Sequence, residues 1–149
     1  MVDRFHRGLV AGIVAGLAMN LWTLLPLFIL NWEVLRFIDW AGIVIFGDLP
    51  RSHLQGLFAL VMQLLWTGLL GVGFAYLIPQ VTSRGYLIKA AFYGIIVGFV
   101  TYAIPTLFQM PFLAQHSFAT VISNHIGGLI WGVVMGLTLR WLDAREVRV

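Results

Sequence analysis

Four long apolar runs constrain this chain more than any other feature. They extend over residues 8–30, 54–78, 90–108 and 118–139. A helix needs about 20 predominantly apolar residues to cross the hydrocarbon of a bilayer. Backbone groups in hydrocarbon must be paired within the segment itself, so each run is predicted to be an α-helix. We therefore expect an all-α membrane protein, a four-transmembrane-helix bundle that forms a single integral membrane domain over residues 1–149.

The composition favours a bilayer rather than water as the solvent. Of the 149 residues, 60% are hydrophobic and 10% are charged, whereas soluble domains carry about 25% charged residues. The net charge of +3 does not indicate a nucleic-acid-binding protein, because the charges lie outside the apolar runs. The chain contains no cysteine, which excludes disulfides, iron–sulfur clusters and thiolate-bound zinc.

Most basic residues fall on one side of the predicted bundle. That side carries Arg4, Arg7, Arg84, Lys89, Arg140, Arg145 and Arg148, and the other side carries Arg36 and Arg51. Cytoplasmic loops of membrane proteins are enriched in Lys and Arg, so we expect both termini in the cytoplasm. The first run is longer than the apolar region of a signal peptide, about 7–15 residues, and is interpreted as an uncleaved membrane helix.

Residues 31–52 are predicted to form an outer interfacial segment, because they are too few to cross the bilayer twice. The segment is apolar and is interrupted by charged residues that include Glu33, Arg36, Asp39 and Asp48. Trp32 and Trp40 suit the headgroup zone, which favours a helix lying along the interface. A flap that binds a partner is the alternative. Ser52 and Gln55 have the spacing of a capping box at the start of the next helix.

Small residues spaced four apart form three rows, a glycine-zipper pattern. The rows are Gly8, Gly12 and Gly16; Ala90, Gly94 and Gly98; and Gly128, Gly132 and Gly136. Helices in lipid associate where small residues let their backbones approach closely, so these rows predict packed faces. They do not distinguish an internal partner from a second subunit. With three rows for four helices, one row is available for a homodimer. A glycine-lined cofactor slot is the alternative use.

The two halves of the chain resemble each other. Arg7-Gly8 recurs as Arg84-Gly85, the Gly12–Gly16 spacing recurs as Gly94–Gly98, and Pro26 with Phe28 recurs as Pro105 with Phe108. Helices that point the same way would then be related by an axis along the membrane normal. Two related helical hairpins and chance similarity of glycine-rich helices both remain open.

Each predicted helix places one polar side chain at a similar depth, roughly 18–24 Å from the cytoplasmic end at 1.5 Å per residue. This intramembrane polar layer consists of Asn20, Gln63, Thr101 and His125, with Asn124 and Tyr102 beside it. Interhelical hydrogen bonds commonly fix helix packing, which is the structural interpretation. The functional alternative is a path for a proton, ion or solute, in which His125 would be the proton carrier or ligand.

The segment His125-Ile-Gly-Gly-Leu129 has an echo at His53-Leu-Gln-Gly-Leu57. His53 lies about 17 Å further out by the same depth count, so the two histidines are not expected to ligate one haem. His53 and His116 are expected at the solvated outer surface. No acidic residue occurs in the four runs. We therefore expect no catalytic set, no metal site and no cofactor.

Several short stretches together resemble a known group of proteins. They are Arg7-Gly8 with Gly12 and Gly16, Arg36-Phe-Ile-Asp39-Trp40-Ala-Gly42, Gly47-Asp48-Leu-Pro50, Gly71 to Tyr76, and Thr82-Ser-Arg84. The pattern resembles small four-helix inner-membrane proteins of Gram-positive bacteria, which are themselves uncharacterised. The resemblance implies a bacterial plasma-membrane protein and implies no activity or site.

The sequence therefore predicts a small non-catalytic integral membrane protein that acts as a subunit or scaffold, as a homo-oligomer or within a membrane complex. The first alternative is a channel or transporter that passes a small solute or a proton through the polar layer. The second alternative is a haem- or quinone-binding redox subunit.

Overall fold

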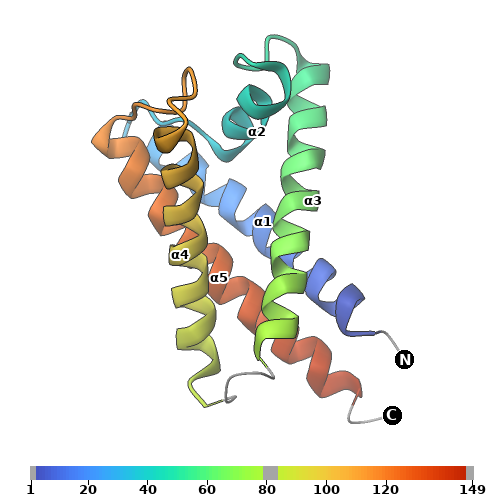
Figure 1. Cartoon of the computed structure of the whole chain (residues 1–149). Coiled ribbons are helices and arrows are strands. Elements are labelled where there is room, and N and C mark those ends of the chain that lie inside the picture. The colour runs from blue at the N-terminus through green and yellow to red at the C-terminus, as the bar shows by residue number, and fades with distance from the viewer. Residues whose placement is uncertain (1–2, 79–83, 147–149) are drawn as a thin grey trace.

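The computed structural model describes residues 3–78 and 84–146, and over these residues it is helical with no strand (Figure 1). The helices are α1 (Arg4–Phe28), α2 (Phe37–Phe46), α3 (His53–Leu77), α4 (Tyr86–Leu107) and α5 (Phe118–Glu146). All except α2 are long and apolar enough to cross a membrane, by length and composition. The prediction of an all-α chain with four long apolar helices is therefore confirmed.

The helix ends differ from the ends of the apolar runs because polar residues cap or extend the helices. At the start of α1, the Asp3 carboxylate accepts a hydrogen bond of 2.8 Å from the His6 backbone N–H. At the start of α3, the Ser52 hydroxyl accepts from the Gln55 N–H, but the Gln55 side chain accepts from Arg51 instead of completing a capping box. Residues 79–83, which connect the second and third apolar runs, and Arg148 lie outside the described residues.

The four long helices pack in the order α3, α1, α5, α4, with α1 and α5 in the centre. Figure 1 shows α1 and α5 running side by side, with α3 and α4 leaning against them. Trp131 of α5 is fully buried and its indole N–H donates a hydrogen bond of 3.2 Å to the Gly12 carbonyl of α1. The main core is made of small residues of α1 and large side chains such as Phe74 and Met135.

The glycine rows lie at close contacts between helices of this chain. A methyl group on Gly12 would meet the Thr67 backbone, and one on Gly71 would meet the backbone of Gly8 and Gly12, at the α1–α3 contact. At the α4–α5 contact, a methyl group on Gly94 would meet the backbone of Gly128 and Gly132. Each row therefore has an internal partner, and the structure leaves none of them facing outward for a second subunit.

The short helix of the 31–52 segment, α2, is tucked against the long helices. It lies between the upper parts of α3 and α4, at the end of the molecule away from the start of α1 (Figure 1). Asp39, Trp40, Gly42 and Ile43 are buried. Trp40 and Ile43 pack with Leu113, which follows α4, in a second small core. The helix occupies only the middle of the segment, and residues 31–36 before it are not helical.

Candidate functional site

One polar contact joins α1 to α3. The side-chain amide of Asn20 donates hydrogen bonds of 2.7 Å to the Gln63 side-chain oxygen and 2.9 Å to the Gly16 carbonyl of its own helix. Gln63 is buried. The Asn20 Oδ1 and Gln63 Nε2 atoms are buried without a hydrogen-bond partner among the described residues. The contact therefore links two helices, and Asn20 Oδ1 could still accept a hydrogen bond while Gln63 Nε2 could still donate one.

A second polar contact joins α5 to α4 and to the segment before α2. The buried Asn124 amide donates hydrogen bonds of 3.0 Å to the Tyr102 hydroxyl and 3.2 Å to the Leu35 carbonyl. The Tyr102 hydroxyl donates in turn to the Thr120 carbonyl, at 3.3 Å. Three separate parts of the chain meet at this one amide.

The two contacts occupy corresponding places in the two helix pairs. Asn20 lies eight residues after Gly12, and Tyr102 lies eight residues after Gly94. Gln63 lies eight residues before Gly71, and Asn124 lies eight residues before Gly132. The glycines of each pair meet at a close contact, Gly12 with Gly71 and Gly94 with Gly132. Each helix pair thus carries a glycine contact and, about two turns further along, a side-chain hydrogen bond.

His125 belongs with the second contact. Its ring stacks on the Tyr102 ring with centroids 5.2 Å apart, and its Nδ1 atom lies 2.8 Å from the Val121 carbonyl of its own helix. Because a carbonyl only accepts, Nδ1 is the donor in this contact. The half-buried ring lies beside Gly98 of α4.

The polar side chains predicted to form one four-helix layer instead form two separate contacts, one in each helix pair. Thr101 takes part in neither contact. Thr101 is exposed, and its hydroxyl donates to the Val97 carbonyl of its own helix at 2.8 Å. The residue that turns inward on α4 is the next one, Tyr102. A depth count fixes how far along a helix a side chain lies, but the direction it faces depends on how the helices pack.

An aromatic cluster lies beside the second contact and was missed by sequence reasoning. The Trp40 ring lies 4.8 Å from the Tyr102 ring and 4.9 Å from the His116 ring, between centroids. His116 was expected to be solvated, but it is half-buried and bonded to the Leu113 carbonyl at 2.7 Å. His53 is exposed at the start of α3. No local pattern indicates the cluster, because its members come from three distant segments.

Charged residues lie at the helix ends and at the connections. Arg36 binds the Asp39 carboxylate through its backbone N–H and two side-chain nitrogens, at 2.7–2.9 Å. These hydrogen bonds raise the pKa of the Arg36 guanidinium above its ordinary value. A nearby groove of about 630 Å³ is lined mainly by residues 31–36. Asp48 pairs with Arg51, which lowers the pKa of the Asp48 carboxyl.

The interior offers amide, hydroxyl and imidazole groups, which can bind polar groups by hydrogen bonds. Within the part of the chain that the structure describes, no group of three His, Cys, Asp or Glu side chains could hold a metal ion. Comparisons with protein-family models, with curated proteins and with solved structures found no match.

Proposed function

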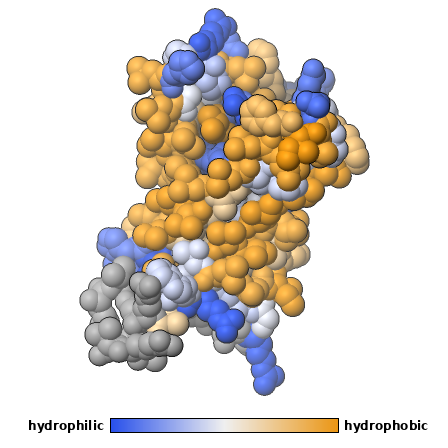
Figure 2. Space-filling view, turned by 180° about the vertical axis from the view of Figure 1, so that it is seen from behind, coloured by the Kyte–Doolittle hydropathy of each residue, from blue (hydrophilic) through white to orange (hydrophobic). Residues whose placement is uncertain are grey.

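We propose that this chain is a non-catalytic integral protein of the bacterial plasma membrane, in which α1, α3, α4 and α5 span the bilayer. The observation that carries the proposal is the exposed surface of these helices. Figure 2 shows an apolar band between two polar ends. Large apolar side chains such as Leu21, Phe92 and Phe99 are more than 60% exposed. A continuous apolar surface of this kind suits contact with lipid tails or another protein and disfavours water.

The charges support an orientation with both termini in the cytoplasm. Arg4, Arg7, Lys89 and Arg140 lie at the end where α1 and α4 begin, and basic residues are enriched on the cytoplasmic side of membranes. Because the chain contains no cysteine, single-cysteine variants can be labelled without removing native thiols. An impermeant maleimide should label Gln115→Cys in sealed right-side-out vesicles, and should label Arg140→Cys only after permeabilisation. The reverse pattern would overturn the orientation.

We propose further that the protein acts as a subunit or scaffold, with α4 as the contact for a second copy or for another subunit. The membrane-spanning window of α4 is 11% buried, against 39–44% for the other long helices. Its outer face carries Phe92, Ile96 and Phe99. Since the glycine rows serve internal contacts, a partner would meet these large side chains. Native mass spectrometry from a mild detergent tests this proposal, because a single-chain mass without any partner contradicts it.

A small polar path through the membrane is the second candidate function, and one observation favours it. Four buried polar atoms of α1, α3 and α5 have no hydrogen-bond partner among the described residues: Asn20 Oδ1, Gln63 Nε2, Ser123 Oγ and Asn124 Oδ1. Buried groups of this kind commonly hold ordered water. Flux of protons or small solutes into proteoliposomes separates the two functions. The scaffold proposal expects background flux in both the parent protein and His125→Ala, whereas flux that is lost in His125→Ala supports the path.

The matched contacts support the proposal that the chain consists of two related helical hairpins, α1–α3 and α4–α5. Similarity of the glycine spacings alone is weak support, because small residues are common in apolar helices. The added support is that Asn20–Gln63 and Tyr102–Asn124 stand at the same distance in residues from the corresponding glycines.

A further inference from the structure

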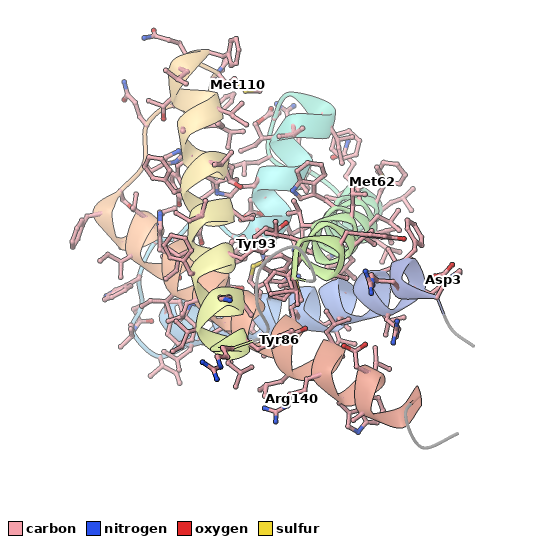
Figure 3. All side chains as sticks on the ribbon, turned by 60° about the horizontal axis from the view of Figure 1, so that its bottom comes forward. Asp3, Met62, Tyr86, Tyr93, Met110 and Arg140 are labelled. Carbon is pink, nitrogen blue, oxygen red and sulfur yellow. The ribbon has the colours of Figure 1, made fainter. Side chains whose placement is uncertain are left out.

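A small cavity lies at the end of the molecule where α1 and α4 begin and α3 ends. Its volume is about 180 Å³. Arg4 and Arg7 of α1, Tyr86 of α4 and Asp143 of α5 line it, and apolar side chains of α5 and the α3 end complete the wall. Figure 3, in which this end faces forward, shows Tyr86 at the start of α4. The cavity has room for several water-sized groups, and therefore for one phosphate group.

The cavity has an excess of positive charge. Arg7 forms an ion pair of 2.9 Å with Asp143, and the Arg7 side chain is only 17% exposed whereas that of Asp143 is 51% exposed. The Arg4 guanidinium lies over the Tyr76 ring, 5.9 Å from its centroid. Among the described residues, the cavity lining thus carries two guanidinium groups and one carboxylate, and the carboxylate is the more solvated partner of its ion pair.

A buried donor of the cavity wall has no acceptor within the described structure. The Tyr86 hydroxyl oxygen is buried and makes no hydrogen bond with the described residues. Leaving a buried hydroxyl without a partner is unfavourable, and an oxygen atom in the cavity would remove that cost. The cavity therefore combines positive charge with an unused neutral donor.

We propose that this cavity binds the headgroup phosphate of an anionic phospholipid. Guanidinium groups match the geometry of phosphate oxygens, and basic pockets between membrane helices on the cytoplasmic side bind anionic headgroups. Exposed apolar side chains flank the cavity in the sequence: Leu77 precedes the cavity-lining Ile78, and Ile88 follows the cavity-lining Tyr86 by two residues. The acyl chains of a lipid bound in the cavity can run along these apolar helix surfaces. The inference rests on the proposed membrane location.

Native mass spectrometry of the full chain with equal amounts of phosphatidylglycerol and phosphatidylcholine tests the proposal. The parent protein should retain phosphatidylglycerol in preference to phosphatidylcholine. Tyr86→Phe and Arg4→Gln should each weaken this binding by about tenfold, as expected for a hydrogen bond to a charged group. Asp143→Asn should strengthen it, because it removes the carboxylate that competes for Arg7. Arg140→Gln is the matched control, since Arg140 is exposed on α5 at the same end and does not line the cavity.

Specific results would overturn the proposal. If Arg140→Gln weakens binding as much as Arg4→Gln does, the attraction is diffuse and no site exists. If inorganic phosphate binds with the same dependence on Tyr86 and the lipids show no preference, the ligand is free phosphate. The lipid-free melting temperature of Tyr86→Phe should equal or exceed that of the parent, and a lower value would give the hydroxyl a structural role instead.

The membrane proposal can fail separately from this inference. Extraction of the chain from membranes by alkaline carbonate without detergent would overturn the membrane location. Retention of the chain in carbonate-washed membranes, combined with equal binding of the two lipids, would overturn only the headgroup site.

Discussion

The side-chain amide of Asn20 on α1 donates a 2.7 Å hydrogen bond to the side-chain oxygen of Gln63 on α3. This bond lies eight residues from Gly12 on one helix and eight from Gly71 on the other. The glycines bring the two backbones together, and the amides then fix how far one helix slides along the other. Tyr102 and Asn124 have the same relation to Gly94 and Gly132.

Replacing Gln63 by leucine should destabilise the α1–α3 contact by about 0.6–2 kcal/mol, the range for hydrogen bonds between membrane helices. The Asn20 amide would keep only its bond to the Gly16 carbonyl. Unfolding in mixed micelles measures the change in free energy. Thr101→Val is the control, because the exposed Thr101 hydroxyl bonds only within α4, and its effect should be close to zero. Equal effects of the two variants would contradict the structural importance of the Asn20–Gln63 bond.

Replacing Gly12 by alanine should destabilise the protein by roughly 1–3 kcal/mol, the usual cost of overpacking. The added methyl group would meet the Thr67 carbonyl and Gly68 Cα, and backbone atoms cannot move away as a side chain can. Unfolding in micelles is again the measurement. Gly56→Ala provides the comparison, because nothing lies within 4 Å of its new methyl group. Gly56→Ala should be neutral or stabilising, since alanine favours helix more than glycine does.

Removing the Tyr102 hydroxyl should cost about 0.6–2 kcal/mol. Tyr102→Phe keeps the ring contacts with Trp40 and His125 and deletes both hydrogen bonds of the hydroxyl, the one from Asn124 and the one to the Thr120 carbonyl. The variant therefore measures the two hydrogen bonds of the hydroxyl together, with little change in packing. Tyr76→Phe is the control, because half of the Tyr76 side chain is exposed. A loss of stability in Tyr76→Phe as large as that in Tyr102→Phe would show that the assay does not isolate the helix contact.

Replacing Asp39 by asparagine should loosen α2 without unfolding the long helices. Asp39 is buried and holds both the backbone N–H and the guanidinium of Arg36 at the start of α2. Losing a helix cap costs about 0.5–2 kcal/mol. Hydrogen exchange should therefore become faster at the α2 amides and remain unchanged in α1 and α5. Asp48→Asn should have a smaller effect, because exposed ion pairs such as that between Asp48 and Arg51 contribute little.

Much of the fold could be read from local pattern. Apolar run length indicated the four long helices, and the spacing of small residues indicated the packed faces of α1, α4 and α5. Polar residues such as Asn20, Gln63 and Asn124 stood out because they interrupt apolar runs at similar distances from the run ends. These features depend on residues that are close in sequence, so they can be predicted without knowing how the helices pack.

By itself, the sequence determined the number of long helices, their apolar character and how far along each helix the polar side chains lie. Only the tertiary structure decided that Asn20 meets Gln63, that Tyr102 rather than Thr101 turns toward Asn124, and that the glycine rows are used internally. It also decided that the rings of Trp40 and His116 both pack against the Tyr102 ring. The physical reason is that hydropathy and spacing act along one helix, whereas a contact between helices depends on the rotation of each helix about its axis and on the angle at which they cross.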